Sequence, residues 1–174
     1  MFPKTVRAFG KLATLVAVGL SFTSTPAQAG SATANLTVSA SIAQNCIIAT
    51  ATLPFGAYDP VVTNRSTAIN VSTTMTVTCT KGASGITMGL GASANAPAGC
   101  TAPQRCLANS GTYLNYQLYS DSGHTTVWTT AIAETISGGI TTPTAVTIYG
   151  QIPPGQDASI GASYADTVVA TVNY

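Results

Sequence analysis

The longest alternating run in the chain covers residues 67–80, where apolar odd positions follow polar even positions. A period of two places successive side chains on opposite faces of a strand. Thr73 is the one polar residue on the odd side. The pattern therefore predicts a strand with one face in a core and one face in water. The inward set is Ile69, Val71, Met75, Val77 and Cys79, and the outward set is Asn70, Ser72, Thr74, Thr76 and Thr78.

Four further runs repeat this period, with turn-forming Gly, Pro, Asp and Ser clusters between them. Weaker patterns predict strands over residues 46–53 and over residues 125–130, around Trp128. Residues 92–104 are rich in Ala, Pro and Gly and predict a long loop. Six or seven short antiparallel strands favour a β-sandwich over a barrel. The inward sets of the four runs are Ile86, Met88 and Leu90; Leu114, Tyr116 and Leu118; Val146, Ile148 and Ile152; and Val168, Ala170, Val172 and Tyr174.

Composition supports an all-β fold and excludes some partners. Only 6% of the residues are charged, against roughly 25% in an ordinary soluble domain. Thr, Ser, Asn and Gly supply most of the polar side chains, and these residues favour strands and turns over helices. The formal net charge of +1 excludes the broad basic surface that binding to nucleic acid needs.

The N-terminus has the three parts of a secretory signal peptide. Lys4, Arg7 and Lys11 precede an uncharged stretch over residues 12–22, and Ala27-Gln28-Ala29 supplies a small-residue cleavage site. The alternative, a membrane anchor, needs about twenty apolar residues, which is more than this stretch provides. We expect residues 1–29 to be a signal peptide, so that the chain is exported.

Export changes the meaning of the four cysteines, because an oxidising compartment favours disulfides. Four cysteines allow three pairings. Cys100 and Cys106 are close enough in sequence to close a small loop, and Cys46 and Cys79 would then join two strands. A zinc site is the competing interpretation, but the sequence contains no Cys-x2-Cys pair. The spacing favours the pairs Cys46–Cys79 and Cys100–Cys106.

No catalytic or metal-binding pattern accompanies this framework. His124 is the only histidine and lies in a predicted turn, where we expect it to be solvated. The chain has no nucleophile–base pattern, no phosphate-binding glycine loop and no His-x3-His spacing. We therefore expect neither enzymatic activity nor a cofactor. The acids stand apart in the sequence, as Asp59, Asp121, Glu134, Asp157 and Asp166.

One alternating stretch remains between the signal peptide and Cys46. Its apolar positions are interleaved with Asn, Thr and Ser over residues 34–42. One interpretation is the first strand of the sandwich. The other is a strand that leaves its own domain to complete another one. The apolar side is Ala34, Leu36, Val38, Ala40 and Ile42.

Several segments, in order along the chain, resemble the spore coat protein U family, which contains subunits of archaic (Csu-type) chaperone–usher pili. The Tyr-rich segment and the Tyr-Gly-x-Ile-Pro-x-Gly-Gln segment are the more specific ones. The matching segments are the N-terminal stretch ending in Asn45-Cys46, Leu53-Pro54-Phe55-Gly56, Val77-Thr78-Cys79, residues 113–119, Val127-Trp128, residues 149–156 and residues 164–168 leading to Tyr174.

This resemblance implies an incomplete immunoglobulin-like β-sandwich that lacks its last strand and so exposes a hydrophobic groove. It also implies a donor-strand extension over residues 30–43, ahead of a pilin domain over residues 44–174. A periplasmic chaperone would fill the groove first. The extension of the next copy would then replace it at an outer-membrane usher. The acceptor edge would be the last strand, with Val168, Ala170, Val172 and Tyr174.

The resulting hypothesis is a structural shaft subunit of an exported adhesive pilus, built head to tail from copies of itself and capped by a tip subunit. Such filaments serve adhesion and biofilm formation at the cell surface. Two alternatives remain. One is a self-contained secreted sandwich that binds carbohydrate through exposed aromatic residues. The other is a spore or cell-coat protein.

Overall fold

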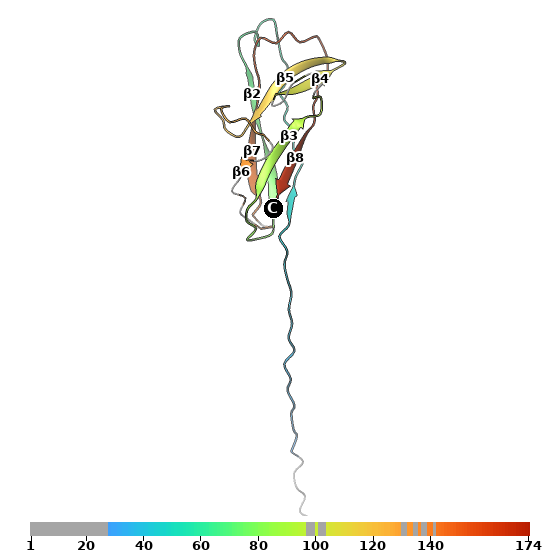
Figure 1. The fold of residues 1–174 in the computed structure, drawn as a ribbon, viewed down its shortest axis with the longest axis vertical. Coiled ribbons are helices and arrows are strands. Elements are labelled where there is room, and N and C mark those ends of the chain that lie inside the picture. The colour runs from blue at the N-terminus through green and yellow to red at the C-terminus, as the bar shows by residue number, and fades with distance from the viewer. Residues whose placement is uncertain are drawn as a thin grey trace, which may run out of the picture. The chain divides into compact units, whose positions relative to one another are not determined.

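The computed structural model describes residues 28–96, 100, 104–129, 132–133, 136, 139–140 and 142–174. Most of the predicted signal peptide and Glu134 lie outside these residues. The chain divides into two units, Met1–Ala40 and Ser41–Tyr174, and all the described strands lie in the second. The strands are β1 (Cys46–Ile48), β2 (Ile69–Cys79), β3 (Thr87–Ser93), β4 (Arg105–Asn109), β5 (Thr112–Tyr119), β6 (Ile132–Ala133), β7 (Thr144–Ile152) and β8 (Val168–Asn173) (Figure 1).

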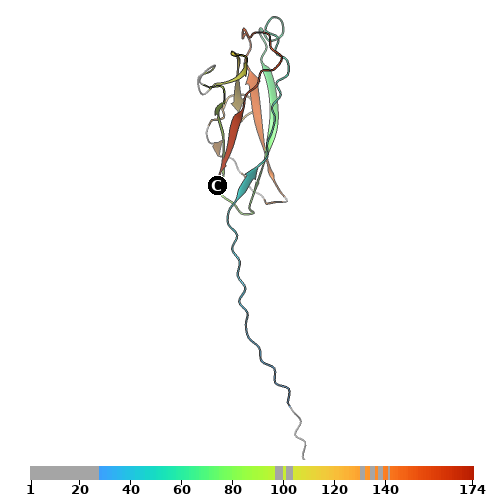
Figure 2. The ribbon, with the colours of Figure 1, turned by 90° about the vertical axis from the view of Figure 1, so that its right-hand side faces the viewer.

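Two sheets form the domain, and every ladder in them is antiparallel. The larger sheet has the order β1-β2-β7-β5-β4, and the smaller has the order β6-β3-β8. Figure 2 separates the two sheets, with β8 on one side and β7 and β2 on the other. This is the predicted all-β class, an immunoglobulin-like sandwich.

The core lies between the sheets and is built from the alternating positions of the sequence. Met88 of β3 and Ile152 of β7 are fully buried, as is Trp128 between the sheets. The predicted inward sets of β2, β3, β5 and β7 are confirmed, with burial decreasing toward the start of β2. The buried hydrophobic residues are Val77, Cys79, Ile86, Met88, Leu90, Leu114, Tyr116, Leu118, Trp128, Ile136, Val146, Ile148 and Ile152.

Three sequence expectations about strands need correction. The predicted strand over residues 46–53 is paired only as far as Ile48. The predicted strand around Trp128 is wrong, because this segment makes an isolated bridge between Val127 and Tyr119 and single backbone hydrogen bonds to Leu118, Ser120 and Leu90, but no continuous ladder. The predicted loop over residues 92–104 begins too early, since β3 continues to Ser93.

Strand β4 was not predicted, and it pairs with β5 in a tight hairpin. Asn109 lies opposite Thr112, so only Ser110 and Gly111 form the loop. Both loop residues have positive φ, 47° and 84°. Two central residues with positive φ define a type I′ turn, whose twist matches that of the flanking strands. This geometry fixes the register of β4, whose first two residues, Arg105 and Cys106, are both buried.

Candidate functional site

Strand β8 has a free edge. One side pairs with β3, for example Ala170 with Leu90, and β8 is the last strand of its sheet. Its side chains alternate as predicted: Val168, Ala170 and Val172 are half-buried against the core, and Val169 points outward. An edge strand presents unpaired N–H and C=O groups, which form a template for another strand.

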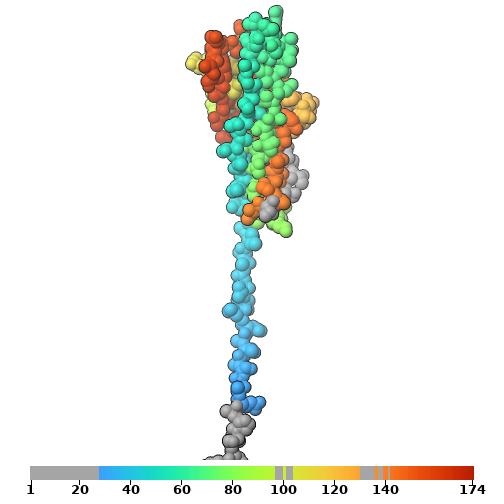
Figure 3. Space-filling view, turned by 180° about the vertical axis from the view of Figure 1, so that it is seen from behind, coloured from blue at the N-terminus to red at the C-terminus, as the bar shows by residue number. Residues whose placement is uncertain are grey.

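The segment after β1 is a second stretch of unpaired backbone. The N–H of Ala49 donates to the carbonyl of Thr76 at 2.9 Å, and beyond it residues 50–57 make no backbone hydrogen bond within the described part of the chain. Leu53 and Phe55 nevertheless point inward and pack against the core. Figure 3 shows this cyan-to-teal segment between the red C-terminal strand and the green β2.

A cavity of about 290 Å³ lies between the free edge of β8 and this segment. It draws side chains from both sheets, and most of them are apolar. An adjoining hollow of about 770 Å³ shares Leu53, Phe55 and Leu107 with it and continues to residues 158–164. The two together form one groove, called here the edge groove. The first cavity is lined by Ala51, Thr52, Leu53, Phe55, Thr73, Met75, Leu90, Leu107, Tyr116, Leu118, Ile148, Asp166, Val168 and Ala170.

Gly150 of β7 lies against Leu53 and Phe55, two residues that line the edge groove. A Cβ atom built at this position would lie 2.6 Å from Leu53 Cδ2 and 2.9 Å from Phe55 Cζ. Real Cβ contacts are essentially never this short. The absence of a side chain at Gly150 therefore allows Leu53 and Phe55 to pack directly onto β7.

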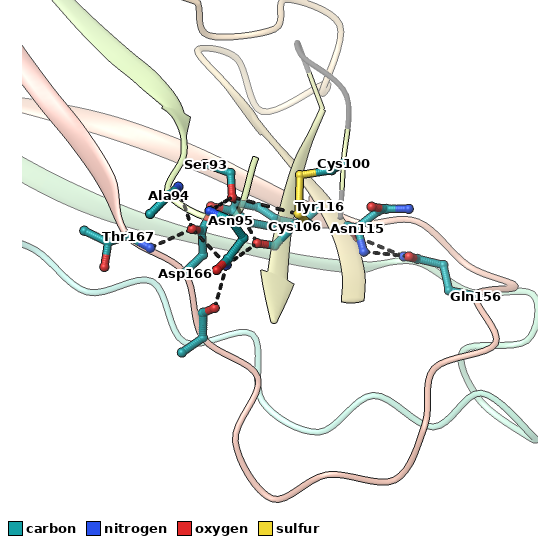
Figure 4. The surroundings of a disulfide bond; sticks show 11 residues. Ser93, Ala94, Asn95, Cys100, Cys106, Asn115, Tyr116, Gln156, Asp166 and Thr167 are labelled. Atoms are coloured by element: carbon teal, nitrogen blue, oxygen red, sulfur yellow. Dashed lines mark hydrogen bonds between the residues drawn. A yellow bond between two sulfur atoms is a disulfide. The ribbon is translucent and has the colours of Figure 1, made fainter. Parts of the chain in front are cut away.

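Asp166 forms the polar rim of the edge groove. Its carboxylate accepts hydrogen bonds from the hydroxyl of Tyr116 at 2.6 Å and from the backbone N–H of Ala94 and Thr167 at 3.0 and 2.7 Å (Figure 4). The side chain of Asn95 donates a further bond at 3.2 Å. Burial raises the pKa of the Tyr116 hydroxyl, and the hydrogen bond to Asp166 raises it further. The network joins the end of β3, β5 and the start of β8.

Arg105 is buried, with 3% of its surface exposed, and the sequence predicted no role for it. Its guanidinium donates to the carbonyls of Leu90, Gly91 and Trp128 at 2.8–3.0 Å and to Gln117 Oε1 at 2.6 Å. Burial lowers its pKa from the ordinary value, but an arginine with such partners stays charged. The side chain ties β4 to β3 behind the wall of the edge groove. The sequence offered no signal for this burial, because β4 shows no alternation between buried and exposed positions.

Gln156 explains part of the Tyr-Gly-x-Ile-Pro-x-Gly-Gln segment. Strand β7 ends at Ile152, and the side-chain amide of Gln156 then replaces it beside β5. Gln156 Oε1 accepts from the N–H of Asn115 at 2.7 Å, and Gln156 Nε2 donates to the carbonyl of Asn115 at 2.8 Å. The backbone N–H of Gln156 donates to the hydroxyl of Tyr58 at 2.9 Å. These bonds fix the loop that borders the larger hollow.

Two disulfides are present, with the pairing that the spacing favours. Cys46 and Cys79 lie directly opposite each other on β1 and β2. Cys100 and Cys106 close a small loop ahead of β4, and the carbonyl of Cys106 accepts bonds from Ser93 and Asn95 (Figure 4). Both bonds hold elements that border the edge groove.

The alternating stretch ahead of β1 forms no strand. Residues 28–45 are exposed, including Ala34 and Ala40, and the exposed fractions of Leu36, Val38 and Ile42 are 83–87%. Three large apolar side chains along one side of an unpaired segment form an unsatisfied hydrophobic stripe. At the other end of the chain, Tyr174 is 55% exposed, and its hydroxyl donates to Asn45 Oδ1 at 2.9 Å.

The other titratable residues do not assemble into a reactive centre. His124 lies in a turn, as expected, but it is half-buried between the rings of Tyr119 and Tyr149, with centroid distances of 5.2 and 6.3 Å. The described residues contain no group of three or more His, Cys, Asp or Glu side chains placed to hold a metal ion. Within the same residues, no helix is long and apolar enough to cross a membrane.

The fold is an antiparallel β-sandwich with a mostly apolar groove beside β8, the last strand of its sheet. The family model described as Spore Coat Protein U domain matches residues 32–171, so the chain belongs to this family. It is 35% identical over 159 residues to Protein U of Myxococcus xanthus, which covers 86% of this chain and 88% of that protein.

A solved structure with a similar fold is the CsuC-CsuE chaperone-tip adhesion subunit pre-assembly complex from archaic chaperone-usher Csu pili of Acinetobacter baumannii. The TM-score is 0.51 at 16% identity, and the match covers 76% of this chain. Our chain spans only 40% of the length of that one. At this identity the likeness concerns the fold alone.

Proposed function

We propose that this protein is a structural shaft subunit of a chaperone–usher pilus, assembled by donor-strand exchange. The observation that carries the proposal is the edge groove, an apolar site between two stretches of unpaired backbone, in a chain that also has an exposed alternating extension. Residues 30–43 of one copy fill the groove of the next. The function is therefore to bind strands and build a filament, without catalysis or a cofactor.

The energetics favour an apolar strand in the groove. An inserted strand gives backbone partners to the free edge of β8 and to residues 50–57. Burying Leu36, Val38 and Ile42 contributes about 1.5–3 kcal/mol for each side chain. A shift by one residue would present Asn35, Thr37, Ser39 and Ser41 to the groove instead, so the register is well specified.

The remaining partners follow from the same site. An unfilled groove exposes apolar surface, so a periplasmic chaperone covers it until assembly at an outer-membrane usher, after removal of residues 1–29. The similar solved fold is that of a chaperone–tip subunit complex, which supports a chaperone and a tip subunit as partners. Donor and acceptor surfaces differ, and a heterologous contact of this kind generates an open filament. The product is an adhesive cell-surface pilus that supports biofilm formation.

Two triple variants of the extension test the proposal. Leu36→Ser, Val38→Ser and Ile42→Ser together remove the apolar side, and we expect no filaments by electron microscopy although the protein is still exported. The matched control changes Asn35, Thr37 and Ser39 to Ala and should keep its filaments. Filaments of normal length from the first variant would show that the extension is not the donor. A chain lacking residues 31–42 serves as the negative reference.

A coat protein is the second candidate, favoured by the family description and by the likeness to Protein U. The two candidates differ in where the protein lies. Immunogold labelling distinguishes a thin filament that extends from the cell surface from a layer that encloses a spore or cell.

A further inference from the structure

The last residues of the extension are fixed to the domain. The side chain of Gln44 pairs with the backbone of Ser84, with Gln44 Nε2 donating to the carbonyl at 3.0 Å and Oε1 accepting from the N–H at 3.4 Å. The N–H of Asn45 donates to Thr80 Oγ1 at 3.1 Å, and that hydroxyl donates to the carbonyl of Ala43 at 3.2 Å. Ala43, Gln44 and Asn45, together with their partners Thr80 and Ser84, form the root of the extension. The backbone of the extension cannot separate from the domain at the root without losing these bonds.

A fixed root limits the distance between neighbouring copies. Ile42 is the last apolar residue of the proposed donor strand, and only Ala43 separates it from Gln44. An extended chain spans at most about 3.3–3.6 Å per residue, so Ile42 lies within ~7 Å of Gln44. When Ile42 occupies the groove of one copy, the domain that it belongs to must therefore touch the end of that groove.

The direction of the inserted strand determines which end of the groove the donor's own domain touches. The root and Tyr174 lie at the end of the domain where β8 finishes, while the loops before β2 and after β7 lie at the other end (Figure 1). A head-to-tail chain needs contacts at opposite ends of each copy. A donor strand that pairs with β8 in the antiparallel direction, as in every other ladder of this domain, provides such contacts. Its Ile42 then lies near Val168 and near the loops before β2 and after β7.

The far end carries three exposed apolar side chains, Val61, Val62 and Ile160, with exposed fractions of 74%, 73% and 106%. The N–H groups of Val61 and Val62 donate to the carboxylate of Asp59 at 3.0 and 3.1 Å, which holds this turn in place. Pro60 lines the larger hollow of the edge groove together with Ile160, and it lines a neighbouring depression together with Val61. The apolar side chains thus adjoin the end of the groove.

Resting on the proposed function, we infer that Val61, Val62 and Ile160 form a docking surface for the root end of a second copy of this chain. The root end offers its own exposed apolar residue, Ile140, which is 87% exposed and follows Gly139, packed against Lys81. The contact adds burial of apolar surface to the strand in the groove, and it sets how one copy is oriented on the next.

A charge on the docking surface tests this inference. The double variant Val61→Asp/Val62→Asp is compared with Thr74→Asp, which places a charge at an exposed position on the outer face of β2, away from the lining of the edge groove. Two measurements are made on the mature chain. The first is the affinity for a labelled synthetic peptide of residues 30–43, and the second is the rate at which filaments dissociate under shear.

The peptide has no domain behind it, so it reports on the groove alone. We expect both variants to bind the peptide as the native chain does, and Val61→Asp/Val62→Asp to dissociate about tenfold faster, the change that 1.4 kcal/mol produces. Dissociation of the double variant at the native rate would overturn the docking surface, and so would weaker peptide binding by the double variant alone. If the native chain does not bind the peptide, the proposed function itself is wrong.

Discussion

Replacing Arg105 tests how the wall of the edge groove is held. Its guanidinium is buried and has no carboxylate partner among the hydrogen bonds that it makes. Its partners are the carbonyls of Leu90, Gly91 and Trp128 and the amide oxygen of Gln117. Arg105→Met keeps an unbranched apolar side chain in place of the arginine stem and removes every donor. Arg105→Lys keeps the charge but offers an ammonium in place of the planar fork.

The expected loss follows from the acceptors left behind. Each hydrogen bond to a charged group contributes about 1.5–3 kcal/mol, but burying the guanidinium costs several kcal/mol, so the contributions do not simply add. In Arg105→Met, each acceptor that stays buried without a donor costs about 1–3 kcal/mol. We expect a net loss of about 3–5 kcal/mol for Met and about 1–3 kcal/mol for Lys. A domain of this size has a total stability of only about 5–15 kcal/mol.

The measurement is urea-induced unfolding of the mature chain, followed by fluorescence of Trp128. This residue is the only tryptophan and is fully buried, so its emission reports on the core directly. A lower midpoint with an unchanged slope isolates the change in stability. If both variants unfold within about 0.5 kcal/mol of the native chain, the side chain at position 105 is not a structural clamp. Equal losses for Met and Lys would show that the planar fork, and not the charge, is what matters.

Two further predictions concern Gly150, which packs against the lining of the edge groove, and Tyr116 at its polar rim. Gly150→Ala forces Leu53 to move and should lower the free energy of unfolding in urea by about 1–3 kcal/mol. Gly30→Ala is the control and should leave this free energy unchanged, because no atom lies within 4 Å of a Cβ at that position. Equal effects of the two variants would contradict the packing at Gly150. The raised pKa of Tyr116 means that the unfolded chain loses this proton first. Its stabilising effect is therefore complete below about pH 10 and is lost as the pH rises further. Tyr116→Phe removes the hydrogen bond to Asp166, so this variant should be less stable than the native chain at neutral pH. It should also lose less stability than the native chain when the pH is raised. If the free energy of unfolding depends on alkaline pH in the same way in both proteins, the reasoning is refuted.

The alternating strands could be predicted because their burial repeats with the period of the backbone. Strand β2 shows this best, since its inward residues meet the core along the whole element. The segment around Trp128 misled the prediction, because an indole is buried as readily by an irregular segment as by a strand. A regular strand over residues 46–53 with Cys46 and Ile48 inward would turn Leu53 outward, but Leu53 packs inward onto β7 at Gly150 instead of continuing the ladder with β2.

Strand β4 and the roles of Arg105 and Asp166 could not be predicted for a different reason. A charged residue ordinarily indicates a solvated position, but Arg105 makes five hydrogen bonds to groups far from it in the sequence, and these offset the cost of its burial. Asp166 meets Tyr116 and Ala94 only in the folded sandwich, from positions far apart in the sequence. Such contacts depend on strand order, which periodicity does not determine. The donor role of residues 30–43 stays a prediction.

The disulfide between Cys46 and Cys79 has a mechanical consequence in a filament of the proposed kind. Tension on the extension enters the domain at the root and reaches Cys46 first. From there the covalent cross-link passes the load directly to the end of β2, which is bonded to β7 along nine residue pairs. Residues 49–68, which lie between β1 and β2 inside the loop that the disulfide closes, carry little of this tension. Residues 51–55, which line the edge groove, lie inside that loop. Tension on the extension of a subunit therefore does not open the edge groove in which that subunit holds its neighbour.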